Sequence, residues 1–104
     1  MAWAFLILAG LLEVVWSFAM KQSEGFTRLA PTLVMIVAMI ASVGLLTLAM
    51  RNLPLGTAYM VWTGIGAVGA FIAGVWLLGE PLTIQRCVAA LLIVLGLAVM
   101  RFSE

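Results

Sequence analysis

The sequence predicts an all-α membrane protein with four transmembrane helices in one domain. Of its 104 residues, 66% are hydrophobic and only 9% are charged, and the mean hydropathy is +1.30. A soluble domain has about a quarter of its residues charged, because its surface faces water. The charges also divide the chain into apolar stretches of about 20 residues, the length that crosses a bilayer as a helix. These two observations exclude a soluble globular fold.

The four predicted spans cover residues 2–20, 29–50, 57–78 and 84–102. Short turns containing charged residues, Pro or Gly separate them, at residues 21–28, 51–56 and 79–81. Pro and Gly are typical of such turns because both interrupt helices. We expect the four helices to pack as one bundle, in a single domain of residues 1–104.

Several functional classes lack a signature in this chain. The net charge of +1 includes no basic cluster, so we expect no nucleic-acid partner. The sequence has no metal-ligand cluster, nucleophilic triad or phosphate-binding loop, so we expect no metal, no cofactor and no enzyme activity. Residues 64–69 match the pattern G-x-G-x-x-G, but they lie inside an apolar span and not between a strand and a helix. We interpret these glycines as packing or hinge positions.

Positive charge is nearly equal at the two ends of the predicted helices. Arg51 and Arg101 lie on the side of both termini, and Lys21, Arg28 and Arg86 lie on the other side. The amino terminus makes the two sides equal. Because such charges set orientation, we expect dual topology and an antiparallel homodimer with the symmetry of an inverted repeat. A single orientation set by a weak bias is the alternative.

Glu13 lies near the middle of the first span, with no basic residue at the same depth. A carboxylate there costs about 2.5–3.5 kcal/mol on insertion scales. Burial, and a second Glu13 facing it in a symmetric pair, favour the protonated form, whereas an entering cation favours the charged form. Competition between protons and a cation for one site is the minimum chemistry of an antiporter. The alternative is a permanently protonated acid that bonds a neighbouring helix.

Aromatic and hydroxyl side chains are placed to surround this acid. Trp16 lies one turn along the same face, Tyr59 and Trp62 share a face of the third span, and Ser42 is in the middle of the second. They offer hydrogen-bond donors and aromatic faces that attract cations. Alternatively, Tyr59 and Trp62 belong to an interfacial aromatic belt, and Ser42 bonds the carbonyl one turn back in its own helix.

Small residues mark the positions where helices are expected to approach closely. Gly10 lies one turn before Glu13 on its face, and Gly66 and Gly69 continue the stripe of Tyr59 and Trp62. We interpret these three glycines as packing or hinge positions. In the last span Ala89 and Gly96 are seven residues apart on one face, which indicates a surface for dimer packing.

The whole chain resembles the small multidrug resistance family. The likeness includes the acid at position 13, the pattern Lys21-x-Ser23-x-Gly25-Phe26-Thr27, and the stretch from Pro54 to Trp62. The segments 10–16 and 61–70 resemble the guanidinium-exporter subgroup more narrowly, and Trp16 stands where the multidrug subgroup typically has glycine. Tryptophan there would narrow the cavity, which suits a small planar substrate.

The resemblance implies a proton-coupled antiporter that exports guanidinium and small guanidinyl cations across the plasma (inner) membrane by alternating access. It implies that Glu13 of each subunit binds both protons and substrate, within a shell of Trp16, Ser42, Tyr59 and Trp62. It also implies an antiparallel homodimer. The alternatives are an antiporter for quaternary ammonium and other drug cations, a passive channel, and a structural subunit of a larger complex.

Overall fold

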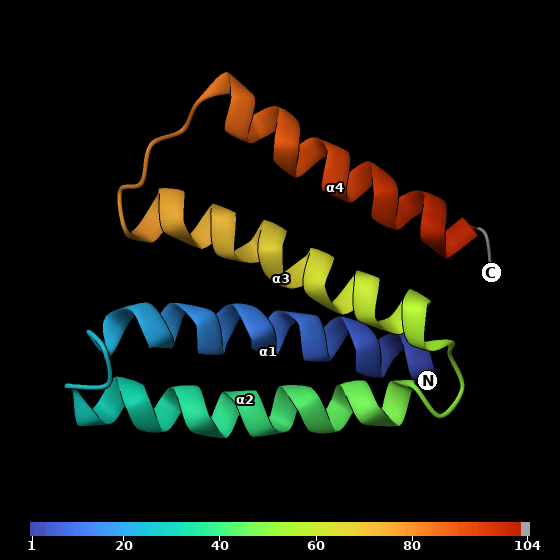
Figure 1. The fold of residues 1–104 in the computed structure, drawn as a ribbon, viewed down its shortest axis with the longest axis horizontal. Coiled ribbons are helices and arrows are strands. Elements are labelled where there is room, and N and C mark those ends of the chain that lie inside the picture. Colours follow the sequence, from blue (N-terminus) through green and yellow to red (C-terminus); the bar gives the residue numbers. More distant parts are fainter. Residues whose placement is uncertain (103–104) are drawn as a thin grey trace.

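The computed structural model describes residues 1–102, which form four α-helices joined by short turns (Figure 1). The helices are α1 (Ala2–Gln22), α2 (Leu29–Ala49), α3 (Leu55–Leu77) and α4 (Ile84–Phe102). Each is long and apolar enough to cross a membrane. At a rise of about 1.5 Å per residue, 21 residues extend roughly 30 Å, the thickness of the hydrocarbon core. The predicted all-α architecture of four helices is confirmed.

The helix bounds differ from the expected spans by more than one residue at two turns. The first helix continues through Lys21 to Gln22, because a lysine in the last turn interacts favourably with the helix dipole and can extend its ammonium to the interface. The third helix begins at Leu55, directly after Pro54. Gly56, expected in the preceding turn, therefore lies in the first turn of α3.

The four helices form an open layer, so the expected bundle is wrong. The molecule measures 41 × 34 × 16 Å, so it is about twice as wide as it is thick. Helix α1 packs between α2 and α3, whereas α4 packs only on α3 (Figure 1). No residue of α4 is buried within the described chain. Both ends of the chain's helical part and the α2–α3 turn lie at one end of the layer.

The buried core lies toward that same end, where three helices meet. It consists of small and medium apolar side chains with one tryptophan: Leu6, Ala9, Leu46, Ala49, Ala58, Val61 and Trp62. Alanines on all three helices let the backbones approach closely, as is usual for helix contacts in membranes.

The α1–α2 turn is organised around the buried Ser23. Its hydroxyl donates to the Met20 carbonyl at 2.7 Å and accepts a hydrogen bond from the Phe26 amide at 3.2 Å. Gly25 has φ +73°, and its neighbours Glu24 and Phe26 are also left-handed, at 50° and 69°. This conformation is cheap for glycine and uncommon for other residues, so the serine hydrogen bonds compensate for local backbone strain.

Candidate functional site

Glu13 is the twelfth of the 21 residues of α1 and therefore lies at mid-membrane depth. Its side chain points at α3, where it rests against the bare backbone of Gly66: a Cβ there would overlap the Glu13 carboxyl group. The glycine thus creates the space that the acid occupies. Within residues 1–102, the buried Oε1 atom of Glu13 has no hydrogen-bond partner.

The other two predicted packing glycines also lie at the contact between α1 and α3. A Cβ at Gly10 would come within 2.7 Å of Ile65, and one at Gly69 would overlap Val14. Neither position has room for a methyl group unless its neighbour moves. The structure therefore brings Gly10, Gly66 and Gly69 together along one helix contact, with Glu13 in its middle.

Ser42 connects three helices in a chain of hydrogen bonds. The Trp62 indole of α3 donates to the Ser42 hydroxyl of α2 at 3.0 Å, and that hydroxyl donates to the Ala9 carbonyl of α1 at 2.7 Å. Ser42 is completely buried. The alternative in which Ser42 bonds Ala38 in its own helix is wrong, because the Ala9 carbonyl of the neighbouring helix is within reach. The role of the Ala9 backbone was not predicted, because a backbone carbonyl leaves no residue-type signal in the sequence.

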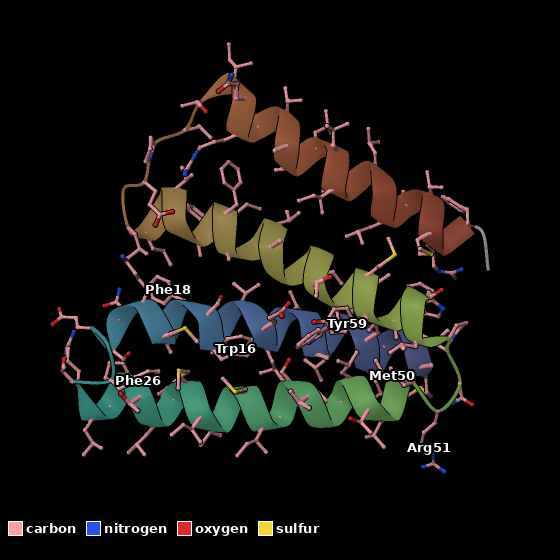
Figure 2. All side chains as sticks on the ribbon, viewed as in Figure 1. Trp16, Phe18, Phe26, Met50, Arg51 and Tyr59 are labelled. Carbon is pink, nitrogen blue, oxygen red and sulfur yellow. The ribbon has the colours of Figure 1, made fainter. Side chains whose placement is uncertain are left out.

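Tyr59 and Trp62 form an aromatic pair on α3. Their ring centroids are 5.4 Å apart and their planes are inclined by 53°. Tyr59 is 51% exposed and Trp62 is buried, so the pair extends from the core to the open face of the layer. Figure 2 shows Tyr59 where α1 and α3 lie close together. Trp62 packs in the core with Leu6 and Ala9 of α1, and the pair offers a phenol hydroxyl and an aromatic face beside that helix.

Trp16 lies on α1 one turn beyond Glu13 (Figure 2). Its side chain is partly buried, and its indole nitrogen is buried without a hydrogen-bond partner among the described residues. One helix turn of α1 thus presents an unpartnered acceptor at Glu13 and an unpartnered donor at Trp16. Buried polar atoms usually find partners, and such atoms at membrane depth are typical of a binding site.

The two small residues predicted for dimer packing lie on the side of α4 that faces α3. Ala89 lines a hollow with Val68 and Phe71, and Gly96 lines another with Met60 and Thr63. Both residues are exposed in the single chain, and a Cβ at Gly96 would meet nothing within 4 Å. The space between α3 and α4 is therefore only partly filled.

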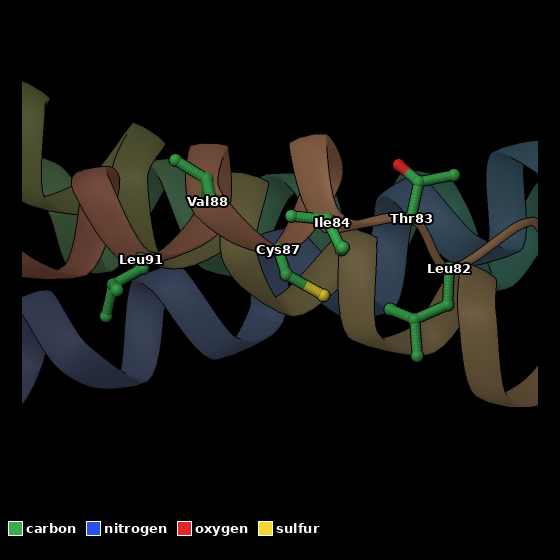
Figure 3. Close-up of a pocket in the computed structure, with 6 residues that line it drawn as sticks. All are labelled: Leu82, Thr83, Ile84, Cys87, Val88 and Leu91. Atoms are coloured by element: carbon green, nitrogen blue, oxygen red, sulfur yellow. The ribbon is translucent and has the colours of Figure 1, made fainter.

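A further hollow, of about 400 Å³, lies at the start of α4 and is separate from the acid (Figure 3). All its lining residues fall between positions 82 and 91: Leu82, Thr83, Ile84, Cys87, Val88 and Leu91. It contains no carboxylate that could bind a cation. The chemistry of the molecule is concentrated at Glu13.

Two further tryptophans lie near helix ends, outside the candidate site. Trp76, near the end of α3, is 83% exposed. Trp3 lies at the start of α1, and the guanidinium carbon of Arg101 is 4.8 Å from its ring centroid. This cation–π contact joins the end of α4 to the start of α1, which otherwise do not pack together.

Four apolar spans define a multi-pass protein of the cell membrane, and the Glu13 carboxyl group at mid-depth is its candidate functional site. Comparison with known proteins gives the family. The family model described as Small Multidrug Resistance protein matches residues 1–95. The chain belongs to the small multidrug resistance family.

Curated relatives match over almost the whole chain. The chain is 53% identical over 103 residues to proteins named Guanidinium exporter from Citrobacter freundii and Salmonella typhimurium. It is 52% identical to the protein of that name from Escherichia coli K12. Each match covers 99% of this chain and 98% of the relative. These relatives are named as exporters, a class of transport protein and not of enzyme.

Proposed function

We propose that this chain exports guanidinium and small guanidinyl cations across the cell membrane in exchange for protons. The observation that carries the proposal is the partly buried Glu13 side chain at mid-depth, whose buried Oε1 atom has no hydrogen-bond partner within residues 1–102. The names of the relatives, at 52–53% identity over nearly the full chain, support guanidinium as the substrate.

Guanidinium suits a site of this composition. Its planar donors can meet a carboxylate in bidentate fashion, with two parallel N–H···O bonds. Aromatic rings attract cations when they are desolvated, and Trp16, Tyr59 and Trp62 supply three. In the proposed site Glu13 binds proton or substrate, Trp16 and Tyr59 contribute hydrogen-bonding and aromatic contacts, and the Ser42–Trp62 hydrogen bond holds the Trp62 ring in place.

Proton coupling follows from the use of one group for two ligands. When Glu13 is protonated it is neutral and has little attraction for a cation, and when it binds guanidinium it has released its proton. If the site changes the membrane face to which it is open only when it holds substrate or protons, each substrate that leaves is matched by protons that enter. This competition is the basis of exchange.

The flat shape of one chain supports a dimeric transporter. A layer 16 Å thick cannot surround a cation and also close on both sides of it. The apolar α4, with no residue buried within the described chain, offers a surface for a second copy, and Ala89 and Gly96 would contribute to its packing. The charge balance between the two ends favours an antiparallel pair, in which the Glu13 residues of two copies face one substrate site.

Guanidinium uptake into proteoliposomes tests the exchange. Purified protein should give saturable uptake that an outward-directed proton gradient, acidic inside, drives uphill. Glu13→Gln, which keeps the size of the side chain but not its charge, should abolish it. Uptake that depends neither on the proton gradient nor on the Glu13→Gln substitution would indicate a channel or a leak and would overturn the proposal.

Orientation is tested separately with a single cysteine in the α2–α3 turn. Asn52→Cys in a Cys87→Ser background should be labelled by a membrane-impermeant maleimide in about half of the molecules, because half would expose this turn outside. Labelling of all or none would contradict dual topology and would leave the export proposal intact.

A further inference from the structure

A hollow with polar lining residues lies in the groove between α1 and α3, at the end of the molecule opposite the amino terminus. Its volume is about 200 Å³, enough for a small cation together with several waters. Ser17 and Lys21 line it from α1, and Ala70 and Gly74 line it from α3. Glu80, just beyond the end of α3, also lines the hollow. The remaining lining residues are apolar: Phe18, Ala73 and Leu78.

Glu80 and Glu13 rest on the same face of α3. A Cβ at Gly66 would overlap the Glu13 carboxyl group, and a Cβ at Gly74 would overlap that of Glu80. These glycines are eight residues apart, which places them on one helix face about 12 Å apart along the axis. The two acids of the groove therefore lie two helix turns from each other against one stripe of small residues.

Two small or polar residues lie between the acids along the contact of α1 with α3. Ala70 lies midway between the two glycines and lines the hollow, and Ser17 lies one turn from Glu13 on α1. The hollow opens at the end of the helices, where Glu80 and Lys21 are exposed. Val14, which packs on Gly69, lies between the hollow and Glu13.

The two charged side chains at the open end of the hollow do not form an ion pair with each other. Within residues 1–102, neither the Glu80 carboxylate nor the Lys21 ammonium has an ion-pair partner within 4.0 Å, although both line the same small hollow. An unpaired carboxylate attracts a cation, and an ammonium in the same hollow weakens that attraction. The two residues therefore act in opposite directions on any cation that enters.

We propose that Glu80 forms an outer binding site for guanidinium-type planar cations at the mouth of the α1–α3 groove, and that Lys21 weakens this site by competing for its carboxylate. The outer site holds the cation two helix turns from Glu13 and raises its local concentration beside the central site. This inference rests on the proposed export function, and Glu80 acts on capture of the substrate and not on its exchange for protons.

Binding to the outer site can be measured after the central acid is removed. In full-length ¹⁵N-labelled Glu13→Gln protein, guanidinium chloride should shift the backbone amide signals of Gly74, Gly79 and Glu80 in a saturable manner. Adding Glu80→Gln should remove these shifts. Adding Glu24→Gln, which neutralises an acid at the same end but outside the hollow, should preserve them. Absence of saturable shifts in Glu13→Gln would overturn the outer site.

Transport kinetics provide a second test with matched controls. Glu80→Gln should raise the half-saturating guanidinium concentration about two- to fivefold, the range expected for one exposed charge pair, and leave the maximal rate unchanged. Lys21→Gln should lower that concentration. Glu24→Gln and Arg28→Gln make the same charge changes outside the hollow and should have neither effect; they also control for altered membrane orientation.

The outcomes separate the two proposals. If wild-type protein exchanges guanidinium for protons and Glu80→Gln leaves half-saturation unchanged, the outer site is wrong and the export function stands. If wild-type protein shows no proton-driven uptake while guanidinium still shifts the Gly74 and Glu80 signals, the export function is wrong and the outer site stands as a cation-binding site.

Discussion

The carboxyl group of Glu13 occupies space that only a glycine at position 66 leaves open. The pair joins the middle of α1 to the middle of α3, so the acid is held between two helices and not on the surface of one. Position 66 consequently controls both how closely α1 and α3 pack and where the carboxyl group points.

Gly66→Ala should therefore disable the central site. The added methyl overlaps the carboxyl group, and overpacking of this kind costs about 1–3 kcal/mol, which corresponds to a roughly five- to hundredfold loss of guanidinium affinity. The measurement is guanidinium binding followed by tryptophan fluorescence. Gly44→Ala is the matched control, because a Cβ at Gly44 would meet nothing within 4 Å. Equal guanidinium affinity in Gly66→Ala and Gly44→Ala would contradict the close contact between Glu13 and Gly66.

Ser42→Ala should destabilise the fold by removing one link between three helices. Trp62 loses its acceptor and Ala9 loses its donor. Hydrogen bonds between membrane helices contribute about 0.6 kcal/mol on average and about 1.7 kcal/mol at most. The loss should appear in equilibrium unfolding in mixed micelles.

Thr47→Ala is the control for Ser42→Ala, because the Thr47 hydroxyl bonds Val43 within the same helix. A double-mutant cycle of Ser42→Ala with Trp62→Phe isolates the coupling between them. Additive effects would show that the hydrogen bond contributes nothing to stability.

Trp16→Gly should widen the range of transported cations. The indole lies one turn from Glu13 with its nitrogen buried, and its removal opens space beside the acid. Relief of a steric overlap of about 1–3 kcal/mol should increase uptake of tetraethylammonium at least about fivefold. Trp76→Gly makes the same change at a side chain that is 83% exposed and should leave selectivity unchanged. If Trp16→Gly does not change the size of the cations that are transported, Trp16 does not limit the space in the site.

Guanidinium binding should weaken as pH falls, because protons compete for Glu13. Protonation neutralises the carboxylate, so in the pH range where the site is mostly protonated the apparent Kd should rise about tenfold per pH unit for each proton displaced. A slope of two protons would indicate two acids in one site. Binding that is independent of pH down to about pH 5 would contradict competition at this carboxyl group.

The sequence alone predicted the helices because both of their determinants are local. Apolar length sets a membrane span, and Pro54 and Gly79 mark helix ends wherever the neighbouring chain lies. The arrangement of helices is different, since it depends on contacts between distant residues. The open layer could not be predicted from four apolar segments, because α4 is as apolar as a core helix and yet packs on α3 alone.

The candidate site was predicted in part for the same reason. An acid at membrane depth is visible in any hydropathy pattern, and Trp16 is its neighbour on the same turn. The hydrogen bond from Ser42 to the Ala9 carbonyl involves a backbone atom, which leaves no residue-type signal in the sequence. Glu80 lies 67 positions after Glu13 in the chain, and only the packing of α1 on α3 places both acids in one groove.

In the proposed pair, the nearly free α4 would make abundance in the membrane a determinant of activity. This helix, which buries no residue within residues 1–102, would gain its packing from a second copy, so assembly would follow mass action within the bilayer. When chains are sparse, the number of pairs rises with the square of chain density. Halving expression would then reduce export to about a quarter, whereas a self-contained transporter would lose only half.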